Sequence, residues 1–250
     1  MELELSGRTA LVTGSSRGIG RAIAEVLHSE GCQVVLNGRT REDLETTMDD
    51  LAGALAVTGD VTRPDDARRV VAESVAALGH LDILVCNVGS GRSVPPGDET
   101  FDEWQRIFEL NLWSTTNTVE SAREVLTPGG VIICVSSICG FEVVAGAPVT
   151  YSAAKAALHA YVRGMARPLG KQGIRIHAVA PGNILFDGST WSHQLAEDAD
   201  RVEEMLQRDV ALSRLGTAHE VAELVAYLAS PRAGFATGGV WPLDGGQLRS

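Results

Sequence analysis

Short apolar runs alternate along the chain with longer segments whose apolar positions recur at helical spacing. Seven runs have the length of strands: Thr9–Thr13, Gln33–Asn37, Ala54–Thr58, Leu81–Asn87, Val131–Ser136, Arg175–Pro181 and Val240–Leu243. Alternation of strands with helices is typical of a parallel sheet. The runs are almost continuously apolar, which indicates that helices cover both faces of the sheet. We therefore predict an α/β fold with a doubly wound parallel sheet of seven strands.

Glycine and proline clusters separate these elements, but none is long enough to link two domains. With 250 residues, 44% of them apolar, the chain can bury one large core, so we expect a single domain over residues 1–250. The longest stretch without an expected strand runs from Gly182 to about Ala218. Its polar middle, Gln194–Arg208, favours an exposed helix. We predict a mobile substrate-binding segment around residues 183–217.

The charge balance argues against two classes of partner. A formal charge of -11 repels nucleic acid and anionic membrane surfaces alike.

The first residues show no basic leader with a cleavage site, and no apolar run approaches the length of a membrane span, so a cytoplasmic location is expected. The four cysteines lack paired spacing, which favours buried thiols over a disulfide or a metal site.

The first strand leads into a glycine-rich turn, Gly14–Gly20, and then into the helical pattern Arg21–Ser29. Glycines let the backbone approach a pyrophosphate, whose charge is stabilised by the free amides at a helix N-terminus. The order of strand, turn and helix predicts a dinucleotide-binding loop. Such a turn is a weak signal alone, and a tight turn without a ligand is the alternative.

The end of the second strand bears on the choice of cofactor. A carboxylate there would bind the adenosine ribose 2′-hydroxyl of NAD, but the chain reads Asn37-Gly38-Arg39-Thr40. Arg39 and Arg17 of the glycine-rich turn can supply charged donors to a 2′-phosphate, which favours NADP(H). The alternative is that both arginines are ordinary solvated charges.

Tyr151 and Lys155 are four residues apart in a segment expected to be helical, so their side chains share one face. The ordinary tyrosine pKa of about 10 is too high for acid–base chemistry at neutral pH, and we expect the Lys155 ammonium to lower it. Tyr151 is then suited to protonate a carbonyl oxygen. An isolated pair of this kind is more often a partly exposed tyrosine beside a solvated lysine.

Two further polar residues support the pair. Ser137 follows the strand Val131–Ser136, at the edge where open α/β sheets bind ligands, and its hydroxyl can bond a substrate oxygen. The alternative is a serine satisfied by the backbone of the next turn. Asn111 lies inside an apolar helical pattern, where its amide needs a buried partner or a water.

Together these residues resemble the short-chain dehydrogenase/reductase family over nearly the whole chain. The motifs, in the family's order, are Thr13–Gly20, Asp60-Val61, Asn87-Val88-Gly89, Asn111, Ser137, Tyr151 with Lys155, Pro181-Gly182 and Asp244-Gly245-Gly246. The resemblance implies a Rossmann-type fold, hydride transfer between a nicotinamide and a substrate carbon, and a homotetramer or homodimer.

The resemblance also implies roles for individual residues. Tyr151 would be the acid–base residue, Ser137 would orient the carbonyl, Lys155 would bind the nicotinamide ribose, and Asn111 would retain a water that links Lys155 to solvent. Cofactor contacts are implied for Gly14, Ser16, Arg17, Gly18, Ile19, Gly20, Arg39, Asp60, Val61, Asn87, Gly89, Tyr151, Lys155, Pro181, Gly182 and Ile184.

Some positions depart from the family's pattern. Val88 replaces the small residue that usually stands between Asn87 and Gly89, and Phe186 stands where the family often carries a threonine that contacts the cofactor. Ser137 also lies one residue further from Tyr151 than is common. None of these differences removes a catalytic group.

We expect an NADP(H)-dependent oxidoreductase that interconverts a ketone and a secondary alcohol. With its length and the arginine in its glycine-rich loop, the chain resembles 3-oxoacyl carrier-protein reductases of this family. A 3-oxoacyl thioester is therefore the first candidate substrate. A sugar, a polyol or a cyclic ketone is the alternative. Candidate pocket residues are Val94, Val143, Val144, Phe186, Trp191 and His193.

Other classes of function fit the sequence less well. A sensor or scaffold that binds NADP(H) without catalysis is the alternative of another class, but such proteins generally lose a catalytic side chain. His219-Glu220 lacks the second histidine of a zinc-binding helix, so no metal is expected. No nucleophile elbow is present, which argues against a hydrolase.

Overall fold

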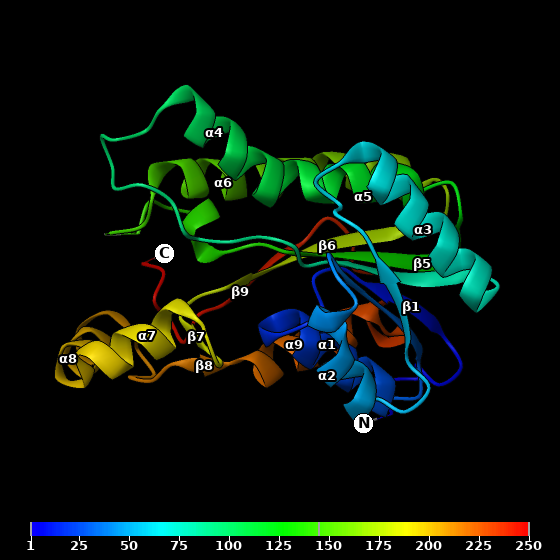
Figure 1. The fold of residues 1–250 in the computed structure, drawn as a ribbon, viewed down its shortest axis with the longest axis horizontal. Helices are drawn as coiled ribbons and strands as arrows, with labels where there is room; N and C mark the ends of the chain where they lie inside the picture. Colours follow the sequence, from blue (N-terminus) through cyan, green and yellow to red (C-terminus); the bar gives the residue numbers. More distant parts are fainter. Residues whose placement is uncertain (1, 145, 250) are drawn as a thin grey trace.

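A parallel seven-stranded sheet forms the centre of the computed structural model, which describes residues 2–144 and 146–249 (Figure 1). Its strands lie in the order β3-β2-β1-β4-β5-β6-β9. Their bounds are β1 Thr9–Val12, β2 Gln33–Gly38, β3 Leu55–Thr58, β4 Leu81–Cys86, β5 Leu126–Val135, β6 Arg175–Pro181 and β9 Val240–Leu243. The predicted doubly wound sheet is confirmed.

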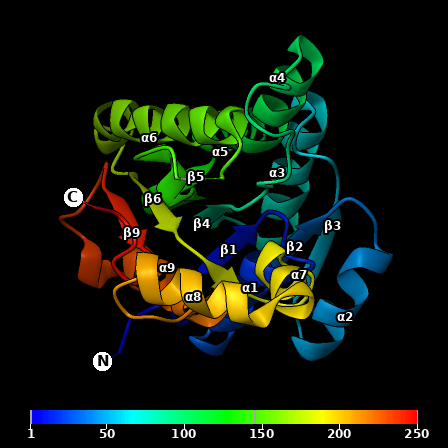
Figure 2. The ribbon, with the colours of Figure 1, turned by 90° about the vertical axis from the view of Figure 1, so that its left-hand side faces the viewer.

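Helices cover both faces of this sheet. One face is covered by α1 (Gly18–Ser29), α2 (Glu42–Asp50) and α9 (Ala218–Ala229); the other by α3 (Pro64–Leu78), α4 (Phe101–Phe108), α5 (Ser114–Ala122) and α6 (Val149–Gly170) (Figures 1 and 2). Three short helical turns, η1 (Glu109–Trp113), η2 (Ile138–Gly140) and η3 (Pro231–Ala233), lie between these elements. The direction of winding reverses between β1 and β4, which is where ligands bind in folds of this kind.

The core consists of two apolar clusters, one on each face of the sheet. Successive residues of β4 alternate between them: Ile83 and Val85 join one cluster, and Leu84 and Cys86 join the other. Because every residue of β4 is buried, the strand shows no polar alternation in its sequence.

The strand β5 begins earlier than its apolar run predicts. Leu126 already pairs with Leu81, and an irregular stretch that contains Pro128 and Gly130 separates this pair from the regular ladder that begins at Val131. The prediction placed the start at Val131 because the Thr-Pro-Gly-Gly sequence has the composition of a turn.

The segment after β6 contains β7 (Ile184–Leu185), α7 (Thr190–Glu197), α8 (Ala199–Asp209) and β8 (Gly216–Thr217). The single helix predicted over Gln194–Arg208 is wrong, because the chain breaks at Asp198, whose carboxylate caps the start of α8. A small apolar cluster of this segment, centred on Val202, Leu206 and Val210, packs apart from the two main clusters. The mobility of the segment stays a prediction.

Residues 2–144 and 146–249 contain no helix with the length and apolar character needed to cross a bilayer. They also contain no group of three or more histidine, cysteine or acidic side chains placed to hold a metal ion. All four cysteines are free thiols, and Cys32, Cys86 and Cys134 are buried.

A buried histidine makes the stability of this fold depend on pH. His177 on β6 is fully buried, accepts a hydrogen bond at Nδ1 from Trp241 Nε1 (3.1 Å), and has a pKa that burial lowers from 6.5 to about 4. Because the unfolded chain takes up this proton at higher pH, His177 destabilises the fold as the pH falls from 6.5 towards 4.

Replacing His177 by Asn keeps an acceptor near the Nδ1 position and removes the titration. We expect His177→Asn to lose about 2 kcal/mol less than the wild type when the pH is lowered from 7 to 5. Urea unfolding at both pH values measures this difference. Equal losses in the two proteins would contradict the assignment.

Candidate active site

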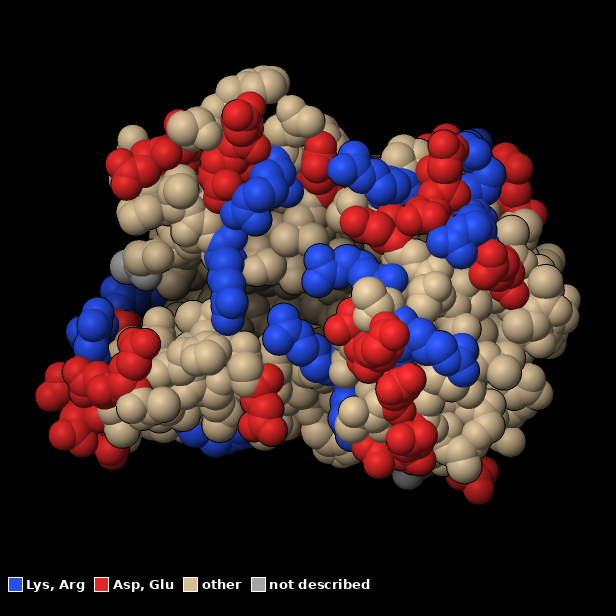
Figure 3. All heavy atoms as spheres, in the orientation of Figure 1, with Lys and Arg blue, Asp and Glu red and all other residues tan. Residues whose placement is uncertain are grey.

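The candidate site lies where β1, β4, β5 and β6 end. The turns that follow these strands carry the glycine-rich loop, Asn87, Ser137 and the segment after Pro181. Figure 3 shows a hollow between the layer that contains α4 and the layer that contains α7, with Lys and Arg side chains along its rim. A basic rim on a chain of charge -11 is suited to an anionic ligand.

The glycine-rich turn leaves its helix N-terminus free for an anion. The helix α1 begins at Gly18, no side chain caps it, and its first turn has no acidic residue. A Cβ at Gly20 would lie 2.3 Å from the Gly14 carbonyl oxygen, so only glycine fits there. Asn87 Nδ2 donates to the carbonyls of Thr13 (3.2 Å) and Gly14 (2.9 Å), which fixes the turn against the end of β4. This geometry fits the pyrophosphate of a dinucleotide.

Two arginines beside this turn have no acidic partner in the described part of the chain. Arg17 and Arg39 are both exposed and enter no ion pair, whereas the neighbouring Arg21 is paired with Glu25 and Asp50. The end of β2 carries no acidic side chain. Its last side chain, Asn37, is buried and donates from Nδ2 to the carbonyls of Val57 and Gly59.

Phe186 contacts the glycine-rich turn. A Cβ at Gly18 would lie 2.6 Å from the Phe186 ring, so the ring packs directly on that glycine. The segment after Pro181 therefore covers the turn. Phe186, expected to line the substrate pocket, thus packs on the glycine-rich turn.

The helix α6 holds Tyr151 in its first turn and Lys155 one turn later. Lys155 is 3% exposed, and its Nζ donates to the Val135 carbonyl oxygen at the end of β5 (3.1 Å). The same Nζ lies 5.7 Å from the centroid of the Tyr151 ring. The ammonium is thus anchored between the sheet and the tyrosine.

Asn111 lies in η1, a π-helical turn between α4 and α5, and is fully buried. Its Oδ1 accepts from the Ser90 amide (3.0 Å), and its Nδ2 donates to the carbonyls of Ser90 and Ile107 (3.1 Å each). A Cβ at Gly89 would lie 2.8 Å from Asn111 Oδ1 and 3.2 Å from Lys155 Nζ, so the glycine lets these two groups approach. Asn111 therefore fixes the loop after β4 directly beside the lysine.

Ser137 caps η2, where its Oγ accepts from the Cys139 amide (3.2 Å).

Burial raises the pKa of Tyr151 to about 12, and a hydrogen bond from Ser137 acts in the opposite direction. Burial lowers the pKa of Lys155 to about 8. The pKa of Tyr151 is therefore raised in this structure and not lowered as expected, because burial of the phenol outweighs the hydrogen bond with Ser137. Stabilisation of the phenolate by Lys155 stays a prediction.

The remaining candidate residues are dispersed. Val143 is 68% exposed, Val144 and Val94 are partly buried, and His193 is exposed. Trp191 packs in the small cluster of α8. Asp60 stabilises its own turn, since its carboxylate accepts from the amide and hydroxyl of Thr62.

Two residues near the site were not predicted from the sequence. Cys139 lies close to Ser137 and Tyr151. His159 is buried behind Gly140, and its Nε2 has no hydrogen-bond partner among the residues that the structure describes. His159 is four residues beyond Lys155, so helical spacing alone could have indicated that it lies on the same face.

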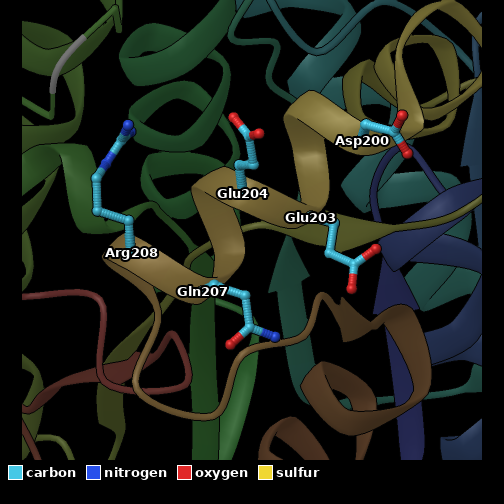
Figure 4. A pocket seen from close by; sticks show the side chains of 5 residues that line it. All are labelled: Asp200, Glu203, Glu204, Gln207 and Arg208. Atoms are coloured by element: carbon cyan, nitrogen blue, oxygen red, sulfur yellow. The ribbon is translucent and has the colours of Figure 1, made fainter.

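A hollow of about 630 Å³ lies beside α8 and is lined by Asp200, Glu203, Glu204, Gln207 and Arg208 (Figure 4). All five side chains project from one helix. None of the catalytic candidates lines this hollow.

Comparison with known proteins gives the family. A family model described as enoyl-(acyl carrier protein) reductase matches residues 14–247. A Streptomyces violaceoruber protein named as a ketoacyl reductase of the granaticin polyketide synthase is 38% identical over 95% of this chain and 94% of its own. Glucose 1-dehydrogenase of Gluconobacter oxydans is 33% identical over 96% and 92%.

Solved structures agree with these relatives. A short-chain dehydrogenase of Burkholderia cenocepacia, solved in complex with NADP, superimposes with a TM-score of 0.89 at 31% identity, over 97% of this chain and 98% of its own. A matching family model over residues 14–247, full-length relatives and the shared architecture all agree. The chain belongs to the short-chain dehydrogenase/reductase family of oxidoreductases.

Proposed function

We propose that the chain uses NADP(H) to interconvert a ketone and a secondary alcohol, with Tyr151 as the acid–base residue. The observation that carries this proposal is the meeting of Tyr151, Ser137 and Lys155 at the end of β5. A hydroxyl pair of this kind can bond one substrate oxygen from two sides.

The side chains have distinct tasks in the reduction. When bound, the nicotinamide supplies a hydride to the carbonyl carbon. With a pKa of about 12, Tyr151 is protonated at neutral pH, so its phenol can donate a proton to the oxygen as negative charge develops there. Ser137 holds this oxygen in place. The Lys155 ammonium stabilises the phenolate that remains.

The charge distribution supports NADP(H) over NAD(H). Arg17 and Arg39 flank the cofactor turn without acidic partners among the described residues, and the end of β2 lacks a free carboxylate. The Burkholderia cenocepacia relative was solved with NADP. A 2′-phosphate accepts charge-assisted hydrogen bonds from guanidinium groups of this kind.

A 3-oxoacyl thioester is the substrate class that we favour. A ketoacyl reductase is among the relatives at 38% identity. A sugar or polyol is the second candidate, because a glucose dehydrogenase matches at 33% identity over nearly the same length. Initial rates of NADPH oxidation with 3-oxoacyl thioesters, cyclic ketones and keto sugars distinguish these classes. Cofactor binding without turnover on any of them would instead support a sensor.

Tyr151→Phe removes the proton donor but keeps the ring. We expect NADPH binding within about twofold of the wild type and a loss of activity of about 10²-fold or more, the contribution typical of general acid catalysis. Tyr161→Phe is a matched control, since Tyr161 lies on the same helix and packs into the core. Comparable activity in Tyr151→Phe and Tyr161→Phe would exclude the proposed role.

Arg39→Ala tests the choice of cofactor. Losing a charge-assisted hydrogen bond of about 1.5–3 kcal/mol predicts a fall of about 10- to 100-fold in kcat/KM for NADPH, with little change for NADH. Arg167→Ala, an exposed arginine of α6, serves as the control. A preference of the wild type for NADH, or an equal effect on both cofactors, would overturn this assignment.

A further inference from the structure

The loop between β4 and α4 is tied to the catalytic helix through one serine. Ser93 Oγ lies 2.7 Å from Glu103 Oε1 of α4 and 2.7 Å from Thr150 Oγ1 of α6. Thr150 is fully buried and directly precedes Tyr151. The three side chains come from a loop and two helices that are far apart in the sequence.

The ionised state of Glu103 sets the direction of these hydrogen bonds. Arg106 donates to both carboxylate oxygens of Glu103 (2.6 and 2.8 Å). Together with Ser93, Arg106 lowers the pKa of Glu103 to about 2. An ionised carboxylate only accepts, so the single Ser93 proton points to Glu103. Thr150 must then donate to Ser93. The hydrogen bonds thus form one directed chain, in which Thr150 donates to Ser93 and Ser93 donates to Glu103.

The position of Glu103 within its helix shows that this arrangement is specific. Thr100 and Glu103 occupy the N-cap and third position of α4, as Thr217 and Glu220 do in α9. Glu220 completes a capping box by accepting from the Thr217 amide (2.8 Å). Among the described residues, Glu103 accepts no such bond from Thr100 and reaches Ser93 instead. The Glu103 carboxylate therefore binds the loop after β4 through Ser93 and does not cap its own helix.

One end of this hydrogen-bond chain, Thr150, directly precedes Tyr151, and its middle member, Ser93, lies in the loop after β4. Val94, a candidate pocket residue, follows Ser93, and its amide also contributes to lowering the Glu103 pKa. Arg106 donates further to the Arg92 carbonyl oxygen (3.1 Å), so the loop is held on both sides of Ser93. Asn111 binds Ser90 in the same loop.

We propose that Glu103, Ser93 and Thr150 are positioning residues that clamp the substrate-side loop, residues 90–97, to the start of the catalytic helix. The clamp fixes the distance between Val94 and Tyr151, and with it the width of the cleft that receives the substrate carbonyl. This role rests on the proposed function. The clamp itself is a property of the loop and is measurable without turnover.

The first test is amide hydrogen exchange of the NADPH-bound protein. Because each lost hydrogen bond frees the loop to open, exchange in residues 90–97 should accelerate about tenfold or more in Ser93→Ala, Glu103→Gln and Thr150→Val. Thr150→Ser keeps the hydroxyl and should exchange like the wild type. Glu73→Gln breaks an exposed pair with Arg69 on α3 and is the matched control for Glu103→Gln.

The second test is steady-state kinetics with the N-acetylcysteamine thioester of 3-oxobutanoate. A loosened cleft predicts a KM about five- to tenfold higher in Ser93→Ala and Thr150→Val, with kcat within about threefold and the NADPH dissociation constant unchanged. Thr150→Ser should restore the KM. A general structural defect would instead lower kcat and cofactor binding together.

The outcomes separate the clamp from the proposed function. Unchanged exchange in residues 90–97, or an equal change in Glu73→Gln, overturns the clamp. Faster exchange with an unchanged KM overturns its role in substrate binding. If the wild type does not turn over any carbonyl, the proposed function fails while the exchange experiment still decides the clamp.

Discussion

The burial of one ammonium group constrains the whole catalytic end of the sheet. Lys155 has 3% of its surface exposed and enters no ion pair with any described residue; the Val135 carbonyl is its hydrogen-bond partner. Burying a charge in this way is unfavourable, and the lysine pKa falls to about 8 as a result. The strand end, the glycine at position 89 and the buried Asn111 amide are all arranged around this group.

The two halves of the site are built by different physical means. Backbone geometry forms the half that we propose for the cofactor, where glycines 14, 18 and 20 leave the N-terminus of α1 free and Asn87 bonds the turn. Side chains brought from separate elements form the chemical half. Ser137 comes from η2, Tyr151 and Lys155 come from α6, and the loop after β4 is held from η1 and α4.

The sequence predicted most of the fold because each buried strand is a nearly unbroken apolar run between glycine or proline turns. Local patterns also placed Tyr151 and Lys155 on one helix face. They failed at β5, whose first residues have the composition of a turn, and at Asp198, where a cap divides one expected helix into two. In both places a tertiary or capping interaction outweighed composition.

Contacts between residues far apart in the sequence could not be predicted from it. The Ser93–Thr150 bond joins residues 57 positions apart, and no spacing rule relates a loop serine to a helix threonine. The pKa of Tyr151 could not be predicted either, because it depends on how deeply the phenol is buried and on where the ammonium points.

The dependence of the reaction on the Lys155 ammonium is the central claim, and the pH profile of carbonyl reduction tests it most directly. Initial rates at saturating NADPH from pH 6 to 10.5 give kcat/KM for the thioester. Because burial lowers the Lys155 pKa from 10.5 to about 8, the charged form is lost as the pH rises, and kcat/KM should decrease above about pH 8. A profile that stays flat to about pH 10 would contradict the account.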